Sequence, residues 1–360
     1  HRYFKQDHFV NISEYATYFL KFLQTDGNPV VSLYHYVFFD EQQDCNSLQF
    51  EIIRCFYNHG AKISVIGDPN QCVYAFRGAD IRYIINLEQY FVNLKTYNLS
   101  INHRSTPEII NLANASIKFN KEQIFKDMVA TKPTINFLPV VKYFDSLQDQ
   151  NKEIIQAIIN FNKQGIPNDE IAILSRNNFA LKILEEAIER YNTNVEEKIK
   201  YVSLINDDRN DAKPKMRPLH LTLTTIHKSK GLEFAVVYII GCNDELFPSE
   251  TDKLSLNEER RLFFVATTRA KQYLFYFFHG SKNKIAKVSR FIQELDRKYY
   301  HFANYDKKYY FYDDYRSVKW FNGVTETIAL LNEKDIALLR ENGILPKENP
   351  TIKKIHGKHE

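Results

Sequence analysis

The sequence predicts an α/β fold with parallel sheets, because two apolar runs near its start each end at acidic residues. Residues 37–39 run directly into Asp40 and Glu41, and residues 63–66 lead to Asp68. Apolar runs without alternation suit strands that are buried on both faces, as in a parallel sheet. Ligands bind beyond the carboxyl ends of such strands, so we expect these carboxylates to belong to a site.

Helical and extended patterns alternate along most of the chain, which extends the α/β prediction beyond its first part. Apolar periodicity predicts helices over residues 9–24, 46–58, 107–119, 149–164, 178–191 and 257–271. Runs rich in β-branched and aromatic residues predict strands over 36–39, 62–66, 97–101, 140–144, 171–174, 219–225, 235–240 and 273–278.

The last part of the chain has a different composition. Residues 299–321 are crowded with tyrosines and lysines, and we expect a small sheet there, with stacking on nucleic acid as the alternative. Residues 324–345 predict two short helices that meet near Asn332.

Length and composition exclude several classes of protein. The chain has 360 residues, 44% hydrophobic and 26% charged, which suits two domains of about 150 residues each with a remainder. The net charge of +4 is mild, so a nucleic-acid surface would depend on local arrangement. The four cysteines form no CxxC pair, which argues against a zinc ribbon or a disulfide framework and favours a reducing compartment. No apolar run approaches the length of a membrane span.

The acidic residues after the first strand are typical of a magnesium and water site. In P-loop NTPases an Asp at a strand end orders the hydrated metal ion, and a neighbouring group positions the attacking water. Asp40 and Glu41 fit that pattern, although the start of a helix also favours acidic residues.

An aromatic and basic cluster follows the second strand. Tyr74, Phe76 and Arg77 are the residue types that a stacking platform for single-stranded nucleic acid needs, since every base offers a π-face. The alternative is that Phe76 belongs to the core.

Five sequence blocks carry a specific resemblance. DEQQD, GDPNQCVYAFRGA, NHRST, TTIHKSKGLEF and EERRLFFVATTRAK occur between residues 36 and 271 in the order found in UvrD/Rep-like superfamily 1 DNA helicases. GCNDELFPSE, between the last two blocks, is also similar to that family. The resemblance implies two RecA-like P-loop NTPase domains with parallel sheets, the first one incomplete.

The resemblance also implies domain limits. Residues 1–98 would be the second part of the first RecA-like domain, and residues 99–297 the second RecA-like domain. Residues 298–360 would form an aromatic-rich and helical extension. Only 120 residues separate Arg104 from Thr225, too few for the large accessory domain that the family usually inserts there.

The cofactors implied by the resemblance are ATP and Mg²⁺. Asp40 would hold the metal ion, Glu41 would align water, and Gln43 and Gln71 would sense the γ-phosphate. Arg104 and Arg269 would be arginine fingers, although each residue type by itself is common at a surface.

Further residues would bind nucleotide or DNA by the same resemblance. His103 stands where the family usually has a tyrosine that stacks on adenine, and Gly231 and Glu233 would face the nucleotide. Thr225 and His227, at the carboxyl end of a predicted strand, would contact DNA together with the aromatic cluster of Tyr74, Phe76 and Arg77.

One expected motif is missing: no G-x-x-x-x-G-K-[ST] loop occurs in the sequence, and 39 residues precede Asp40. We therefore interpret the chain as a fragment that lacks the Walker A loop and is inactive alone, with an upstream segment or subunit carrying that loop.

The predicted function is that of an ATP-dependent DNA helicase or translocase of UvrD/Rep type. By resemblance it would unwind DNA in the 3′-to-5′ direction during repair or replication. Its partners would be single-stranded DNA and junctions of single- and double-stranded DNA, in the cytoplasm or nucleus, with no membrane. The alternative is a non-catalytic DNA-binding or assembly subunit derived from such a helicase, and a third hypothesis is an RNA-directed relative.

Overall fold

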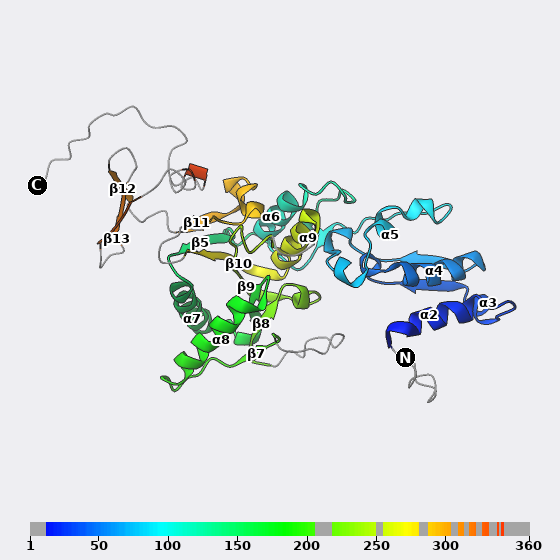
Figure 1. Ribbon diagram of the computed structural model, residues 1–360, viewed down its shortest axis with the longest axis horizontal. Coiled ribbons are helices and arrows are strands. Elements are labelled where there is room, and N and C mark those ends of the chain that lie inside the picture. Colours follow the sequence, from blue (N-terminus) through cyan, green and yellow to red (C-terminus); the bar gives the residue numbers. More distant parts are fainter. Residues whose placement is uncertain are drawn as a thin grey trace, which may run out of the picture. The chain divides into compact units, whose positions relative to one another are not determined.

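The chain divides into two compact units whose sequence segments alternate (Figure 1). The computed structural model describes residues 12–205, 218–249, 255–280, 287–303, 309–312, 317–321, 326–330, 337 and 340–341. The first unit comprises residues 1–101, 117–128 and 253–265, and the second comprises residues 102–116, 129–252 and 266–360.

The first unit contains a two-stranded parallel sheet. Strand β1 (Tyr36–Phe39) pairs with β2 (Lys62–Val65), with Val37 opposite Ile63. Helix α4 (Ser47–Asn58) connects the strands, and α2 (Ile12–Leu23) and α3 (Val30–Leu33) precede them. The expected strand, helix and strand over 36–66 are therefore confirmed. Shorter helical turns follow: η1 (Gln42–Asp44), η2 (Pro69–Gln71), η3 (Ala75–Arg77), α5 (Arg82–Ile85) and η4 (Leu87–Gln89).

The expectation that β1 and β2 are buried on both faces is wrong. Exposure alternates along each strand, and the Tyr36 and Phe38 side chains are 62% and 73% exposed. Val37 and Ile63, on the other face, pack with Leu23 and Phe56 of the helices α2 and α4. Among the described residues the helices cover one face only. The apolar sequence of each strand predicts burial on both faces, but the face that carries Tyr36 and Phe38 is open.

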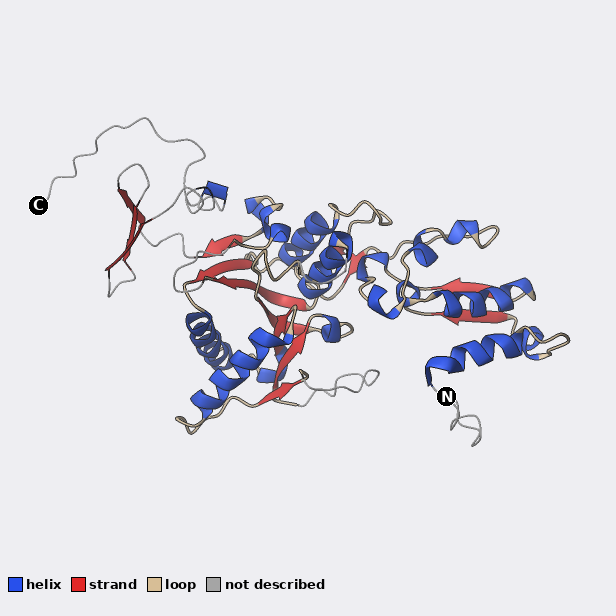
Figure 2. Cartoon of the chain, in the orientation of Figure 1, coloured by secondary structure: helices blue, strands red, loops and turns tan. Residues whose placement is uncertain are grey.

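The second unit is built on seven parallel strands in the order β11-β5-β10-β9-β6-β8-β7. Strands are drawn in red in Figure 2. The strands are β5 (Val140–Phe144), β6 (Ile171–Ser175), β7 (Tyr201–Ser203), β8 (Leu221–Thr225), β9 (Phe234–Ile240), β10 (Ala270–His279) and β11 (His301–Ala303). Every pairing is parallel, which confirms the predicted α/β class with parallel sheets. β6 and β9 are buried along their whole length, as expected for central strands.

Helices α7 (Leu147–Lys163) and α8 (Asn178–Asn192) lie against one face of this sheet (Figure 1). Ile154 and Ile158 of α7 and Leu184 of α8 are fully buried against strand residues such as Val236. Both helices begin at a side-chain cap, Ser146 and Asn177, whose oxygens accept from the backbone of the first turn. This packing forms the main core of the second unit.

The predicted strand over 97–101 is wrong in extent. The structure has only β3 (Ile101–Asn102), which pairs with β4 (Val129–Ala130) in a separate two-stranded sheet. The large sheet begins at β5 instead. The helix α6 (Pro107–Ile117) follows β3 as expected.

The helix predicted over 257–271 ends earlier. α9 (Leu256–Thr267) stops because residues from Ala270 onward already belong to β10 and pair with Phe234. Strand pairing therefore takes the last residues of the predicted helix, and Arg269 lies in the turn between the two elements.

The C-terminal region holds a small antiparallel sheet of β12 (Tyr309–Tyr312), β13 (Ser317–Phe321) and β14 (Glu326–Leu330). The small sheet expected near residues 299–321 is thus confirmed, although β11 joins the large sheet. The first of the two predicted short helices is wrong, because residues 326–330 pair with β13. The second falls mostly outside the described residues.

Two expectations about the whole chain can be compared with the described residues. No disulfide is formed by Cys45, Cys55, Cys72 or Cys242. Within the described part of the chain, no helix is both long and apolar enough to cross a membrane.

Candidate functional site

The predicted acidic pair stands at the carboxyl end of β1. The Asp40 side chain is exposed, and its Oδ1 accepts a hydrogen bond from the Glu41 backbone at 2.8 Å. Glu41 has φ 53° and ψ 41°, in the left-handed region that residues other than glycine, asparagine and aspartate rarely adopt. Such strain persists only where the surroundings enforce it, and it is concentrated at functional sites.

Gln43 is one of the groups that enforce this geometry. Its side chain is 1% exposed, its Nε2 donates to the Glu41 carboxylate, and its Oε1 accepts from the Asp68 backbone at 2.8 Å. A Cβ on Gly67 would lie 2.6 Å from Gln43 Oε1, so only glycine leaves room for the amide. Gln43 therefore braces the end of β1 against the end of β2.

Gln71 belongs to the same network. Its Nε2 donates to Asp68 Oδ2 at 2.9 Å, and Asp68 Oδ1 also accepts from the Asn70 backbone at 3.2 Å. Lys126 forms an ion pair with Asp68 at 3.2 Å, with both side chains about one-fifth exposed. Hydrogen bonds through Gln43 and Asp68 thus connect Glu41 with Gln71.

The predicted aromatic and basic cluster is formed. The Tyr74 and Phe76 ring centroids are 5.9 Å apart, and the Arg77 guanidinium lies 5.2 Å and 5.7 Å from them. Phe76 is 60% exposed, so the alternative that it belongs to the core is wrong. Glu258 of α9 accepts from the Ala75 backbone at 3.0 Å and fixes this turn. Burial and the nearby Asp44 raise the pKa of Tyr74, against the opposing charge of Arg77.

Three predicted residues come together in the second unit. Arg104 Nε donates to Glu233 Oε2 at 2.6 Å, and Arg104 Nη1 donates to the Thr268 carbonyl at 3.3 Å. Arg269 is 2% exposed and donates to the Leu232 carbonyl and to Thr268 Oγ1, both at 3.1 Å. The two arginines and Glu233 are therefore parts of one polar cluster around Thr268.

This polar cluster lies at the amino ends of two strands. The Phe234 backbone donates to the Arg269 carbonyl at 3.0 Å, so the cluster stands at the amino ends of β9 and β10. Thr225, by contrast, is the last residue of β8, and His227 begins the turn η6 (His227–Ser229). Because the strands are parallel, Thr225 and His227 lie at the carboxyl ends of the strands, opposite the polar cluster at the amino ends.

Two predicted nucleotide contacts stand apart from the cluster's hydrogen bonds. The exposed His103 ring lies with Nδ1 3.0 Å from Thr131 Oγ1, at the β3–β4 pair. Gly231 has φ +84° with open space where a Cβ would stand, so its backbone conformation, and not crowding, favours glycine.

Neighbouring cationic groups lower the pKa of the Glu233 carboxyl. Burial disfavours its charged form, but the hydrogen bond and charge of Arg104, with Lys271 and Arg269, outweigh burial and lower its pKa. Glu233 is therefore an anion at neutral pH and holds Arg104 in place.

Two family models match the chain in sequence. The UvrD/REP helicase N-terminal domain matches residues 1–92, and the UvrD-like helicase C-terminal domain matches residues 97–202 and 183–281. The chain belongs to the UvrD/Rep-like helicase family. The resemblance that the five sequence blocks carry is thereby confirmed.

Relatives of this UvrD/Rep-like chain are named as DNA helicases. A "Probable DNA helicase" of Mycoplasma pneumoniae is 30% identical over 274 residues, which are 74% of this chain and 48% of that protein. PcrA of Staphylococcus epidermidis is 31% identical over 44% of this chain and 22% of its own length. Rep of Buchnera aphidicola is 31% identical over 47% of this chain and 26% of its own length.

The chain therefore spans about half, or less, of the length of these three relatives. A solved C-terminal domain of a possible DNA helicase from a Lactobacillus superposes with a TM-score of 0.38 at 15% identity. That superposition covers 56% of this chain and 98% of the other.

A UvrD/Rep-like protein is expected to bind a divalent metal ion. Among the described residues no three His, Cys, Asp or Glu side chains converge as a complete metal site. Mg²⁺, however, is usually bound through one or two carboxylates together with water and substrate phosphates. The exposed Asp40 carboxylate at a strand end fits that mode.

Several residues of the site carried no adequate signal in the sequence. Lys126 comes from a polar stretch without a pattern, and Thr268 and Glu258 lay in a recognised block without an assigned role. Asp68 was visible only as an acidic strand end, and its bonds to Gln71 and Lys126 depend on tertiary contacts.

Proposed function

We propose that this chain is part of an ATP-dependent DNA helicase that couples ATP hydrolysis to 3′-to-5′ stepping on single-stranded DNA. The observation that carries the proposal is Glu41, whose strained backbone beside Asp40 is held by the buried Gln43. A carboxylate fixed at a strand end in this way suits the alignment of an attacking water.

Each residue of the first unit has a distinct task in this proposal. Asp40 would hold Mg²⁺, which supplies charge neutralisation at the phosphates. Glu41 aligns water and accepts its proton. Gln71, held by Asp68, senses the γ-phosphate. Gln43 holds Glu41 in place and would also contact the phosphate.

In the second unit Arg104 and Arg269 would act as arginine fingers. An arginine finger contributes about 10³–10⁵ in rate. In this structure both guanidinium groups bind carbonyl, hydroxyl or carboxylate oxygens of their own unit. Binding phosphate requires them to exchange these partners, with Glu233 released from Arg104. Gly231 and His103 would complete the nucleotide contacts.

DNA would stack on the exposed Phe76 with Tyr74 and Arg77, while Thr225 and His227 contact the strand. The substrate class is single-stranded DNA and its junctions with duplex, in repair or replication. The absence of disulfides at the four cysteines suits a reducing compartment, cytoplasm or nucleus.

The β- and γ-phosphate grip would come from an upstream segment or subunit that carries a P-loop, since this sequence contains none. The open face of the β1–β2 sheet supports this, because parallel strands are normally covered on both faces. The same missing loop favours the second candidate, a non-catalytic DNA-binding or assembly subunit.

The test is DNA-stimulated ATP turnover by this chain joined to a P-loop segment. We expect Glu41→Gln to reduce turnover about 10²-fold or more, because general-base catalysis typically contributes about 10²–10⁴. Glu51→Gln, in an exposed α4 pair with Arg54, is the matched control and should leave turnover unchanged.

Turnover that survives Glu41→Gln would contradict the assigned role. DNA binding without turnover in the joined protein would favour the assembly subunit, and stronger stimulation by RNA than by DNA would indicate an RNA-directed enzyme.

A further inference from the structure

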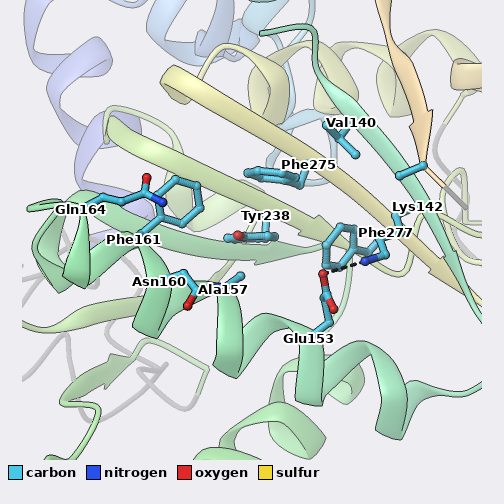
Figure 3. A pocket seen from close by; sticks show the side chains of 11 residues that line it. Val140, Lys142, Glu153, Ala157, Asn160, Phe161, Gln164, Tyr238, Phe275 and Phe277 are labelled. Atoms are coloured by element: carbon cyan, nitrogen blue, oxygen red, sulfur yellow. Dashed lines mark hydrogen bonds and ion pairs between the residues drawn. The ribbon is translucent and has the colours of Figure 1, made fainter.

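A cavity in the second unit lies away from every residue assigned above. It has a volume of about 280 Å³ and lies between α7 and the strands β5, β9, β10 and β11 (Figure 3). It is a half-open slot on the face of the seven-stranded sheet against which α7 and α8 pack. None of the predicted nucleotide or DNA residues lines it.

The walls of this slot are aromatic. Tyr238 and Phe275 stack with centroids 4.5 Å apart and planes 11° apart, and Phe277 meets Tyr238 edge-on at 5.3 Å. Phe161 of α7 lies beside these strand residues at the Gln164 end of the slot (Figure 3), with its ring centroid 6.2 Å from that of Phe275. Rigid rings in this arrangement suit a flat apolar or aromatic guest.

A polar group inside the slot lacks a partner. The Tyr238 side chain is 1% exposed, yet its hydroxyl has no hydrogen bond to any described residue. Tyr276, the comparably buried tyrosine of β10, has its hydroxyl 2.7 Å from Thr267 Oγ1. The Tyr238 hydroxyl is therefore available to an acceptor on a molecule that enters the slot. Burial, with Glu153 nearby, raises the pKa of Tyr238, so it remains a donor.

The two ends of the slot differ. Asn160 and Gln164 present amides at the end toward which the Tyr238 hydroxyl points (Figure 3). Asn160 Oδ1 accepts from Gln156 Nε2 at 3.1 Å, which leaves the Asn160 NH₂ available. At the other end Lys142 and Glu153 form an ion pair at 2.6 Å, so their charges are mutually neutralised. A neutral guest with a polar edge matches this lining better than an ion does.

We propose that this slot binds a planar aromatic heterocycle of one or two rings, with a ring acceptor that receives the Tyr238 hydroxyl. The size follows from volume, since a cavity of about 150 Å³ binds benzene and this one measures 280 Å³. The polar edge of the ring would lie toward Asn160 and Gln164. The inference does not depend on the ATPase proposal, because it uses none of the same residues.

Quinoline and naphthalene make a matched pair of probes, since they share shape but only quinoline carries an acceptor nitrogen. In ligand-observed NMR titrations of the whole chain at neutral pH, we expect quinoline to bind about 2–10-fold more tightly, the value of one hydrogen bond. In Tyr238→Phe this preference should disappear while naphthalene binding persists. Equal binding of both probes to the unchanged chain, or binding of neither, would overturn the proposal.

Folding controls keep the result interpretable. Tyr238→Phe should leave thermal stability unchanged or higher, because it removes an unpaired hydroxyl, whereas Tyr276→Phe should lower it. Ala157→Phe, inside the slot, should abolish binding of both probes, and Lys152→Phe on the exposed side of α7 should not. Binding that survives Ala157→Phe would contradict the location.

The source of the ring is distinguished by comparing adenine, adenosine and a single-stranded oligodeoxyadenylate. Binding of the free base or nucleoside that Tyr238→Phe weakens supports a small-molecule ligand, and binding only of the strand with the same sensitivity supports a base of nucleic acid. Insensitivity of all three to Tyr238→Phe would argue against a heterocycle in this slot.

Discussion

At the scale of single residues, the network from Glu41 to Lys126 shows why one glycine is needed. Gln43 bonds to Glu41 and to the Asp68 backbone in a space that a side chain on Gly67 would occupy. The amide is buried, and its loss would leave the Asp68 N–H without its acceptor. Gln43 thus fixes the position of the Glu41 carboxylate, independently of any contact that Gln43 makes with nucleotide.

Gly67→Ala and Gln43→Ala form a double-mutant cycle. Gly67→Ala should destabilise the first unit by about 1–3 kcal/mol, because its Cβ meets Gln43 Oε1 at 2.6 Å and Ile84 Cδ1 at 2.8 Å. Gln43→Ala should cost about 1–3 kcal/mol for the unpaired Asp68 N–H. Urea unfolding should show the double variant less destabilised than the sum, because the shortened residue removes one clash. Strict additivity would contradict the contact.

The Arg104–Glu233 pair makes stability depend on pH. The pKa of Glu233 is lowered from its ordinary 4.5, so the pair stabilises the fold above about that pH and is lost as pH falls through the lower folded value. Both side chains are about one-third to one-half exposed, so the contribution is small, about 0.2–1 kcal/mol.

Glu233→Gln should therefore lower the melting temperature at neutral pH and converge with the unchanged chain in acid. Glu186→Gln, in the exposed pair with Arg190 on α8, is the control and should have a smaller effect. A constant difference at every pH would show that the Glu233 charge does not stabilise the fold.

At the scale of elements, β1 and β2 have one packed face and one open face. Ile53 of α4 is 2% exposed in a cluster with Phe50 and Phe91, while Phe38 on the open side is 73% exposed. The helix is fixed at its start by a capping box, in which Asn46 and Gln49 bond to each other's backbone. The exposed apolar side therefore contributes little to the fold of this chain.

The two faces predict opposite responses to substitution. Phe38→Ser should change the free energy of unfolding by no more than about 0.5 kcal/mol, as surface replacements do. Ile53→Ala should cost about 2–5 kcal/mol, because it leaves a cavity between α4 and its neighbours. Chemical denaturation measures both, and a cost for Phe38→Ser equal to that of Ile53→Ala would mean that the open face is covered in solution.

At the scale of the whole molecule, each unit has its own hydrophobic core. Ile53 belongs to the small cluster near the β1–β2 sheet, and Ile158 lies at 0% exposure in the large cluster under α7 and α8. The segments of both units alternate in sequence, yet each core is built from residues of one unit.

Separate cores predict two cooperative transitions in calorimetry. Ile53→Ala should lower the transition of the first unit, and Ile158→Ala that of the second, each by several degrees for a cost of about 2–5 kcal/mol. A single transition that both substitutions lower equally would show that the two cores unfold as one.

The sequence by itself determined the α/β class, most strands and helices, the family, and the exposed aromatic turn. It could do so because buried strands, helix periods and polar strand ends are local patterns that neighbouring residues specify. Residues such as Asp40, Glu41 and Phe76 were recognisable for the same reason.

Only the tertiary structure decided the features that depend on contacts between residues far apart in the sequence. It ended α9 at Thr267, turned 326–330 into a strand, and reduced the strand predicted over 97–101 to two residues. It also grouped Arg104, Glu233 and Arg269 at the amino ends of β9 and β10, left the Tyr238 hydroxyl unpaired, and joined Lys126 to Asp68. These outcomes depend on which distant groups meet, and a hydrogen bond between residues far apart in the chain leaves no periodic trace in either segment.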